Sequence, residues 1–308
     1  MGLVVSHARQ GTKVADRLPD HQTPLRRAVL LNRTEAYVLE IMAAGYAPDE
    51  IEQALRLALD RWRAVSIEPE QPDPHVLRFI GSHDPAMALI AAHYHDVTQG
   101  YTLQLSFTGS LGGLIALAEK RADLAGCHLW DERTDTYNET YVRNILPGQK
   151  VALMTLAHRR IGLILQPGNP HHLTGLQDLI TPGIRFVNRQ PGSGTRVWLD
   201  AQLHLAKLNP TDITGYSDEK MTHSEVASAI SKDQADVGLG VETAALSFGL
   251  DFELLTTERY DLVIPGDQWE LDTSQALKNW LNTPQAKAAI NNLGGYDTSQ
   301  TGTVRWIE

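Results

Sequence analysis

Cysteine is almost absent from this chain of 308 residues, which contains only Cys127. A lone thiol excludes a disulfide framework and any zinc module built from several cysteines. Long apolar runs are also missing, because no stretch approaches the ~18 residues of a membrane helix and the first residues lack the apolar core of a secretory signal. These absences predict a cytoplasmic protein without a membrane partner. The length allows two domains, each with its own core.

Basic charge is scarce outside the N-terminal part of the chain. The formal net charge is -10, and the first 65 residues hold nine Lys and Arg against eight Asp and Glu. The other 243 residues hold 18 basic and 29 acidic side chains. An acidic body repels the phosphates of nucleic acids, so only the N-terminal part is expected to face DNA.

Local patterns divide the chain into three regions. Short β-prone runs at 3–5 and 12–14 predict a β-hairpin with a basic tip. A helix over 23–44 and a second one from Pro48 follow, since proline suits the first turn of a helix. A proline-rich linker comes next. The expected division is 1–66 for the hairpin and helical pair, 67–74 for the linker and 75–308 for a ligand-binding domain.

From residue 75 onward, apolar strand-like runs alternate with helical patterns. Strands are expected at 76–80, 102–107, 161–166, 185–188, 236–240 and 261–264. Helices are expected at 85–95, 111–121, 195–206 and 224–232. This alternation predicts an α/β fold with parallel sheets, and its length favours two lobes.

Four of the expected helices begin with glycine or small hydroxyl residues. The four junctions are Gly81-Ser82-His83-Asp84, Thr108-Gly109-Ser110, Gly192-Ser193-Gly194-Thr195-Arg196 and Thr222-His223-Ser224. Ligands of open α/β sheets bind beside such helix starts, where free N–H groups and the helix dipole attract anions. Such residues are also ordinary helix caps, but four junctions in one body favour an anion-binding cleft.

Several longer motifs resemble those of a known family, in the same order. They include Phe107-Thr-Gly-Ser-Leu-Gly-Gly-Leu, Ala122-Asp-Leu-Ala-Gly, Asn188-Arg-Gln-Pro-Gly-Ser-Gly-Thr-Arg and Ala235-Asp-Val-Gly-Leu-Gly. They resemble the periplasmic-binding-protein-like domain of molybdate-sensor regulators over about 75–305. The resemblance implies a two-lobed type 2 periplasmic-binding-protein-like fold that closes on an anion. Lobe I would comprise 75–157 and 254–308, and lobe II would comprise 158–253.

The N-terminal part resembles the end of a GntR-type winged helix. Gly2-Leu-Val-Val-Ser and Arg9-Gln-Gly-Thr-Lys-Val-Ala are similar to the wing, and a helical pair at 36–65 follows. The resemblance implies the effector domain of a transcriptional regulator. The recognition helix, which reads bases in this class, is not in this sequence. DNA is therefore an expected partner only if a complete winged helix precedes the wing, and the helical pair is expected to form a homodimer contact.

The resemblance also implies an anion held by neutral donors, the N–H groups and hydroxyls of Ser82, Thr108, Ser110, Ser193 and Thr195. Further candidate ligand-binding residues are Arg196, Thr222, His223 and Tyr260, and no cofactor is expected. Neutral donors suit fully deprotonated molybdate or tungstate, whereas hydrogenphosphate carries a proton that needs an acceptor. Arg196 leaves two alternatives open. Inside the cleft it would favour an organic carboxylate, and outside it would be a surface ion-pair partner.

An enzyme is the alternative class of protein, but the residues that could be catalytic give little support for it. Cys127 and His128 are neighbours on an expected strand, so their side chains point to opposite faces. Glu242 is a lone carboxylate near a helix start, and His93 and His95 face apart on one helix. We therefore predict a binding protein and not an enzyme or a metal protein. A cytosolic solute-binding protein without DNA binding is the third interpretation.

Overall fold

The computed structural model describes two separate units of the chain. The described residues are 4–7, 11–14, 34–35, 37–38, 41–42, 46–52, 55, 75–98 and 100–308. The first unit is Met1–Ile67 and the second is Glu68–Glu308. The expected linker at 67–74 lies outside the described residues.

The first unit contains the predicted hairpin. Strands β1 (Val4–His7) and β2 (Gly11–Val14) pair in antiparallel fashion, with Val4 opposite Val14. The described residues at 34–42 and at 48–55 are helical. Most of the first predicted helix, over 23–44, falls outside the described residues.

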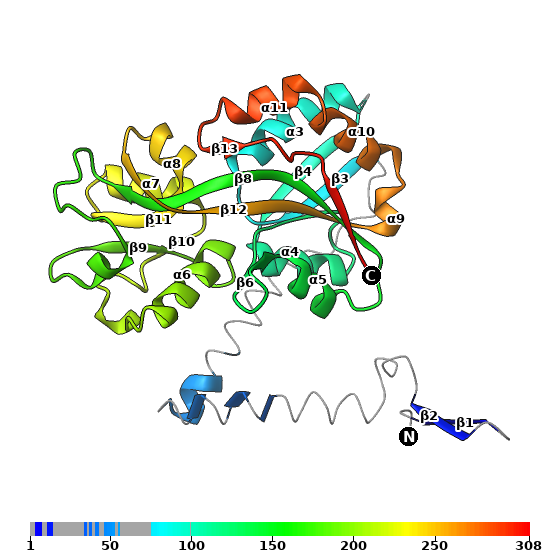
Figure 1. Ribbon diagram of the computed structural model, residues 1–308, viewed down its shortest axis with the longest axis horizontal. Helices are drawn as coiled ribbons and strands as arrows, with labels where there is room; N and C mark the ends of the chain where they lie inside the picture. The colour runs from blue at the N-terminus through cyan, green and yellow to red at the C-terminus, as the bar shows by residue number, and fades with distance from the viewer. Residues whose placement is uncertain are drawn as a thin grey trace. The chain divides into compact units, whose positions relative to one another are not determined.

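Two long strands run through both lobes of the second unit (Figure 1). They are β8 (Val151–Leu165) and β12 (Asp251–Pro265), each of 15 residues, and they pair antiparallel. They form the centre of an eight-stranded sheet in the order β10-β9-β11-β8-β12-β5, with β13 and β14 also on β8. The other strands of this sheet are β5 (Ala125–Cys127), β9 (Phe186–Arg189), β10 (Glu219–Lys220), β11 (Val237–Val241), β13 (Tyr296–Asp297) and β14 (Val304–Ile307).

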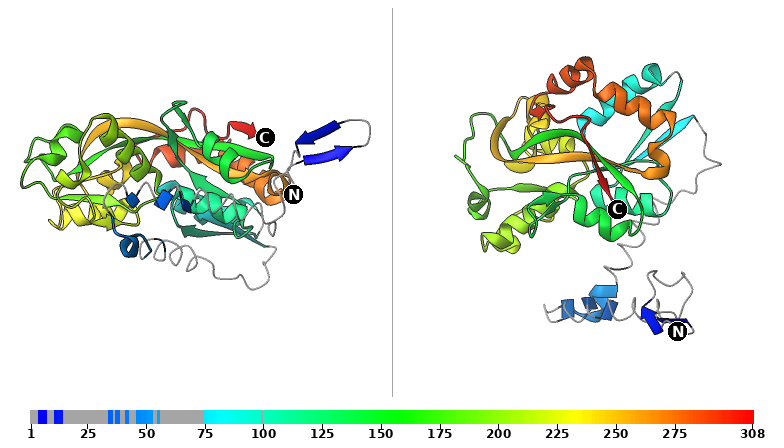
Figure 2. Two further views of the ribbon diagram at one scale, coloured as in Figure 1. Left: turned by 90° about the horizontal axis from the view of Figure 1, so that it is seen from below. Right: turned by 45° about the vertical axis from the view of Figure 1, so that its right-hand side comes forward.

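Lobe I packs helices around a parallel pair of strands and one end of the long strands (Figure 2). Strands β3 (Val76–Gly81) and β4 (Thr102–Phe107) are parallel, with Val76 opposite Thr102. A separate short antiparallel pair is formed by β6 (Trp130–Asp131) and β7 (Thr136–Tyr137). The helices are α3 (Pro85–Val97), α4 (Ser110–Ala118), α5 (Glu139–Ile145), α9 (Gly266–Trp269), α10 (Asp272–Leu281) and α11 (Pro284–Asn291).

Lobe II packs three helices around β9, β11 and the other end of β8. The helices are α6 (Gly194–Leu205), α7 (His223–Ser231) and α8 (Glu242–Ser247). Short 3-10 helices lie at Leu176–Ile180 and Pro210–Asp212. Phe186, Leu199 and Leu239 belong to one buried core in this lobe, whereas lobe I has separate cores around Phe79 and Leu114. Each lobe therefore has its own hydrophobic interior.

The α/β fold is confirmed, but the expectation of parallel sheets is only partly correct. Among the described strands, β3–β4, β9–β10 and β9–β11 are parallel, whereas β8 pairs antiparallel with all its partners. The strands expected at 161–166 and 261–264 are the ends of β8 and β12. Charged residues such as Arg159 and Glu258 interrupt the apolar runs of these strands. For this reason the pattern of apolar residues predicts only one end of each strand.

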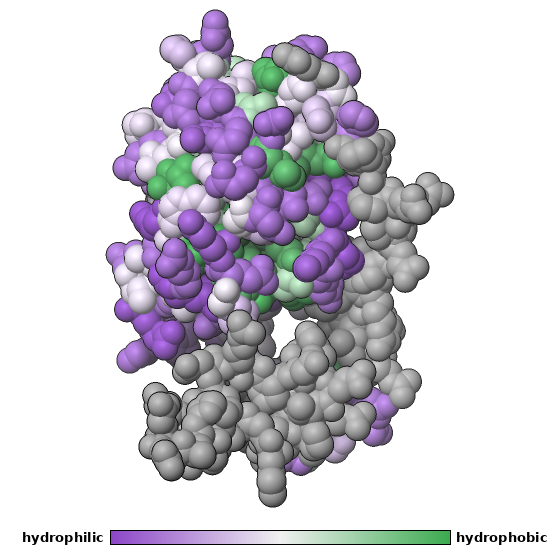
Figure 3. Space-filling view, turned by 90° about the vertical axis from the view of Figure 1, so that its right-hand side faces the viewer, coloured by the Kyte–Doolittle hydropathy of each residue, from purple (hydrophilic) through white to green (hydrophobic). Residues whose placement is uncertain are grey.

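Within the described part of the chain, no helix is long and apolar enough to cross a bilayer. On the face shown in Figure 3, the described residues are mainly hydrophilic, with hydrophobic ones in small separate groups.

Gly126 in β5 packs too closely for any side chain. An added Cβ would lie 2.0 Å from the Tyr260 hydroxyl oxygen and 2.7 Å from the Phe79 ring. We expect Gly126→Ala to lower the free energy of unfolding by about 1–3 kcal/mol through overpacking, measured by urea denaturation. Tyr260→Phe removes the nearest atom, so the double variant should lose less than the sum of the two single losses. Additive losses would contradict this packing.

Candidate functional site

The two lobes touch each other where several helices begin. The backbone N–H of Leu111, in the first turn of α4, donates to the Gly192 carbonyl at 3.5 Å across the lobe interface. A Cβ added to Gly194, the first residue of α6, would lie 2.5 Å from Nδ1 of His128 in lobe I. Only glycine allows this approach. The structure is therefore that of a closed pair of lobes.

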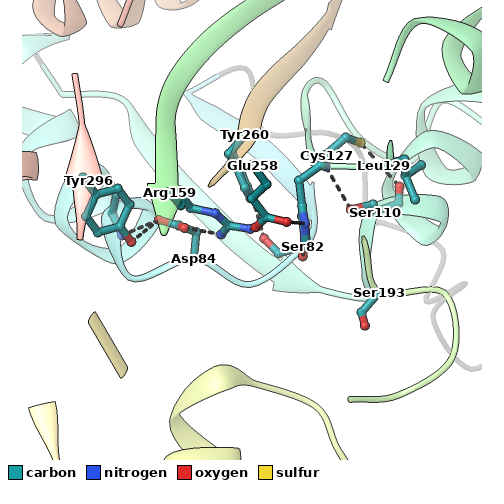
Figure 4. A network of polar contacts seen from close by, with 12 residues as sticks. Ser82, Asp84, Ser110, Cys127, Leu129, Arg159, Ser193, Glu258, Tyr260 and Tyr296 are labelled. Atoms are coloured by element: carbon teal, nitrogen blue, oxygen red, sulfur yellow. Dashed lines mark hydrogen bonds and ion pairs between the residues drawn. The ribbon is translucent and has the colours of Figure 1, made fainter. Parts of the chain in front are cut away.

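A buried ion network lies at this interface, where the long strands cross between the lobes. Arg159 of β8 is 1% exposed, and its guanidinium donates to Asp84 and to Glu258 of β12. Asp84 also caps α3 and accepts a hydrogen bond from the Tyr296 hydroxyl at 3.0 Å. Burial alone would lower the pKa of Arg159, but the two carboxylates raise it well above its ordinary value. Figure 4 shows these contacts leading toward Ser82.

A second chain of hydrogen bonds continues from Glu258 to Ser82. The Glu258 carboxylate lies 2.9 Å from His128 Nδ1, and His128 Nε2 lies 2.7 Å from the Ser82 hydroxyl oxygen. Burial would raise the pKa of Glu258, but Arg159 and His128 together hold it below its ordinary value. Burial lowers the pKa of His128. The chain thus joins an ionised carboxylate, a neutral imidazole and a hydroxyl group.

Arg189, the last residue of β9, is a buried cation without a counter-ion. Its side chain is 0% exposed, Nε donates to Gln190 at 3.2 Å, and Nη2 donates to the Met221 carbonyl at 2.9 Å. Among the described residues, Nη1 has no hydrogen-bond partner, and no carboxylate forms an ion pair with this guanidinium. Burial lowers its pKa to about 9, and the neighbouring charge of Arg159 adds to this. The group is still charged at neutral pH.

Besides Arg189, six described residues have a buried side-chain polar atom without a partner. Two of them, Asp131 and Arg159, hold other hydrogen bonds. The remaining atoms are Thr108 Oγ1, Thr195 Oγ1, His83 Nδ1 and both ring nitrogens of His223.

The rings of His83 and His223 lie 6.4 Å apart across the lobe interface. Burial lowers the pKa of His83 to about 4 and that of His223 well below its ordinary value. Each unsatisfied group costs about 1–3 kcal/mol, so these atoms are suited to a polar ligand.

The structure brings most of the residues predicted from the sequence to this interface. Ser82, Thr108, Thr195 and His223 are described above. Ser110 and Ser193 are also buried, but their hydroxyl oxygens already accept hydrogen bonds, from the backbone N–H of His128 and of Arg196, both at 3.2 Å. These two residues hold the backbone in place, and their hydroxyl protons can still donate to a ligand.

Two other predicted residues support the site from outside. Thr222 caps α7 and accepts a hydrogen bond from the Glu225 N–H at 3.1 Å. Tyr260 donates its hydroxyl proton to the Ser82 carbonyl at 2.6 Å, and its ring stacks on His128 at 5.7 Å. Tyr260 therefore lies behind Ser82 and does not cover a ligand.

Of the two alternatives for Arg196, the structure favours the ion-pair partner. Its guanidinium pairs with Asp200 at 2.9 Å and lies 4.2 Å over the ring of Tyr216. Asp200 is one helical turn away, and Nη1 of Arg196 also donates to the Arg189 carbonyl at 3.2 Å. The buried arginine of this motif is Arg189, seven residues earlier.

Sequence reasoning missed four central residues of the site. They are Asp84, Arg159, Arg189 and Glu258, with His128 treated only as a neighbour of Cys127. The available signal was charge inside apolar strands, because a buried charged group is rare unless it is paired or functional. The partners themselves lie 75 to 130 residues apart in sequence, so no local pattern links them.

The residues weighed for an enzyme lie in other surroundings. Cys127 is buried and its thiol donates to the Ser110 carbonyl at 3.4 Å, away from the side chain of His128. Glu242 pairs with Arg160 at 2.9 Å. No cluster of three or more metal-ligating side chains occurs among the described residues.

Two surface hollows lie away from the interface. One is lined by Gln166, Asp233 and Phe248, and the other by Lys120, Lys150 and Trp306. The unpartnered polar atoms therefore single out the lobe interface as the candidate site.

The histidines of the interface predict a pH dependence of stability. A histidine with a lowered pKa binds fewer protons when folded than when unfolded, so the free energy of unfolding falls as the pH drops from 6.5 toward 4. Each such group contributes up to about 1.4 kcal/mol per pH unit. His223→Gln should flatten this slope, measured by urea denaturation at several pH values. His95→Gln, at an exposed position of α3, is the control, and an equal slope in the wild type and His223→Gln would contradict the assignment.

Comparison with known proteins agrees with the two-lobed architecture. Residues 91–282 match the model of the PBP superfamily domain. The uncharacterized protein YvgK of Bacillus subtilis is 35% identical over 272 residues, which cover 88% of this chain and 82% of YvgK.

Solved structures share the fold at low identity. The sulfate-binding protein SubI from Mycobacterium tuberculosis has a TM-score of 0.54 and 15% identity, covering 72% of this chain and 86% of SubI. A putative phosphate ABC transporter substrate-binding protein with bound phosphate, from Clostridium perfringens, has a TM-score of 0.52 and 13% identity, covering 72% and 98%. With its two lobes, its crossing strands and this family match, the chain belongs to the PBP superfamily.

Proposed function

We propose that this chain is a binding protein that encloses a small oxyanion between its two lobes. The observation that carries the proposal is the buried and uncompensated charge of Arg189. Leaving a buried charge without a partner costs several kcal/mol. An anion against Nη1 would remove this cost.

Donors from both lobes would complete the site. Thr108 and His83 come from lobe I, whereas Thr195, His223 and Arg189 come from lobe II. Helices α4, α6 and α7 begin at the same interface, and their first N–H groups and dipoles favour negative charge. Because such a ligand makes all its contacts only when the lobes are closed, its binding shifts the protein toward the closed state.

The number of free donor atoms favours an oxyanion over a carboxylate. A carboxylate prefers a two-pronged contact with arginine, but Nε and one N–H of Nη2 of Arg189 already donate to Gln190 and Met221, which removes the side-on contact through Nε. Dispersed single donors suit a tetrahedral oxyanion, the class named for the sulfate- and phosphate-binding structural neighbours. Molybdate and tungstate, which the sequence predicts, belong to the same class. An organic carboxylate bound by Arg189 remains the second candidate.

We further propose that closure of the second unit is a regulatory signal. The antiparallel hairpin of β1 and β2 supports the likeness to a GntR-type wing, and the regulator role brings with it the cytoplasmic location and the homodimer. DNA would be a partner only through a complete winged helix. A solute-binding protein without DNA binding is the alternative.

Replacement of Arg189 tests the proposed function. By isothermal titration calorimetry with phosphate, sulfate, molybdate and tungstate, we expect at least one anion to bind the wild type. Arg189→Met should weaken that binding by about 10- to 100-fold, because a hydrogen bond to a charged group contributes about 1.5–3 kcal/mol. The same variant should make the ligand-free protein more stable to heat, since it removes an unpaired buried charge.

Arg196→Met is the matched control, because it removes an arginine of the same motif whose charge is already paired with Asp200. Its affinity for the anion should change less than about threefold. If no anion binds the wild type, or if both variants weaken binding equally, the proposed site is wrong.

The homodimer has its own test. Light scattering of the full chain is expected to give twice the chain mass of 34.0 kDa. A mass of one chain at all protein concentrations would contradict the dimer, with no consequence for the anion site.

A further inference from the structure

The Ser82 hydroxyl group has a defined direction of hydrogen bonding. Its oxygen lies 2.7 Å from His128 Nε2, and His128 Nδ1 lies 2.9 Å from the Glu258 carboxylate. Arg159 also donates to Glu258, and this contact keeps the carboxylate ionised. An ionised carboxylate can only accept, so the proton of the imidazole is on Nδ1.

The neutral ring of His128 then has only a lone pair on Nε2. Burial lowers the pKa of His128, which keeps the second ring nitrogen unprotonated. The Ser82 hydroxyl must therefore donate its single proton to Nε2. Its oxygen keeps lone pairs and has no proton left for a ligand.

Ser82 is linked to residues that carry the unpartnered atoms. The next residue is His83, and the preceding Gly81 accepts a hydrogen bond from the Thr108 N–H at 3.0 Å. His128, the partner of the Ser82 hydroxyl, lies against Gly194, the residue before Thr195. The backbone N–H of Ser82 donates to Gly126, and its carbonyl accepts from Tyr260. The hydroxyl oxygen therefore keeps the unused hydrogen-bonding capacity of Ser82.

We infer that Ser82 is a hydrogen-bond acceptor in the site and that the ligand is an anion with its own O–H group. Hydrogenphosphate has this chemistry, whereas sulfate, molybdate and tungstate do not. A fully deprotonated oxyanion would place its lone pairs against those of Ser82 and leave a buried acceptor unpaired. The inference rests on the proposed anion site and gives it a ligand class.

Thr108 provides the contrast within the same lobe. Its hydroxyl is buried and has no partner among the described residues, so it is free to donate to any oxyanion. Ser82 and Thr108 therefore contribute differently to selectivity, although both are hydroxyl residues at strand ends.

The same three groups, a serine, a histidine and a carboxylate, also make up an acyl-transfer triad. Here the carboxylate is shared with Arg159, and Ser82 is 0% exposed with the lobes closed. We therefore argue for the binding role and make the nucleophilic role an outcome of the test.

The test compares anions that differ in their O–H group. Calorimetry of the full chain at about pH 8, where most phosphate is hydrogenphosphate, measures phosphate against sulfate of the same shape and charge. Glycolate against acetate makes the same comparison for an organic source of the O–H group. We expect the anion with the O–H group to bind at least about tenfold more tightly.

Two variants remove the acceptor and one serves as a control. Ser82→Ala and His128→Phe should reduce the ratio of the sulfate and phosphate dissociation constants about tenfold, since the first lacks the acceptor and the second frees the hydroxyl proton. Thr108→Val should weaken both anions alike and leave the ratio unchanged. Circular dichroism melting curves verify that the variants fold.

The outcomes separate this inference from the proposed function. Equal binding of phosphate and sulfate to the wild type, with glycolate and acetate also equal, would overturn the inference and leave the anion site intact. An unchanged ratio in Ser82→Ala would do the same. Acetylation of Ser82 by p-nitrophenyl acetate, detected by mass spectrometry, would replace the acceptor role by a nucleophilic one. If no anion binds at all, the proposed function fails and the inference fails with it.

Discussion

The pairing of Arg159 with two carboxylates is the interaction on which the closed arrangement depends. Arg159 lies where β8 passes from one lobe to the other, and burial of its charge is tolerated only because Asp84 and Glu258 accept its hydrogen bonds. Asp84 fixes the start of α3, and Glu258 fixes the crossing point of β12. Removing one partner of such a buried pair typically costs 3–5 kcal/mol. The interface is thus built around a charge that the protein itself neutralises.

Arg189 is as deeply buried as Arg159, but no carboxylate among the described residues balances its charge. Both guanidiniums are fully enclosed, yet the pKa of Arg159 is raised by its carboxylates and that of Arg189 is lowered to about 9. The difference lies in their partners, because Arg189 has only an amide and a carbonyl group as acceptors. A fold stabilised for its own sake would place a carboxylate or an apolar residue there. The unpaired guanidinium of Arg189 agrees with the proposed anion from solution.

The features that the sequence predicts here depend on neighbouring residues. The alternation of strands and helices, the hairpin at the N-terminus and the polar helix starts at Ser82, Thr108 and Thr195 all follow from local patterns and capping chemistry. The buried charges depend on partners that are distant in sequence, so their pairing was not predictable. Arg189 and Arg196 illustrate the limit. Both stand in one glycine-rich motif, but Arg196 pairs with Asp200, whereas Arg189 at the end of β9 is buried without a carboxylate partner in the described part of the chain.

The sequence also could not show that the Ser82 hydroxyl donates to His128, and the choice of anion depends on the direction of this hydrogen bond. The buried network of Asp84, Glu258, Arg159 and Arg189 has two formal charges of each sign. A bound anion must therefore be held by the position of Arg189 and by neutral donors, and not by a net positive charge. Under these conditions selectivity depends on which hydroxyl groups donate and which accept. Because the Ser82 hydroxyl donates to His128 Nε2, and His128 Nδ1 donates to Glu258, a site composed of donors in the sequence becomes a site with one acceptor in the structure.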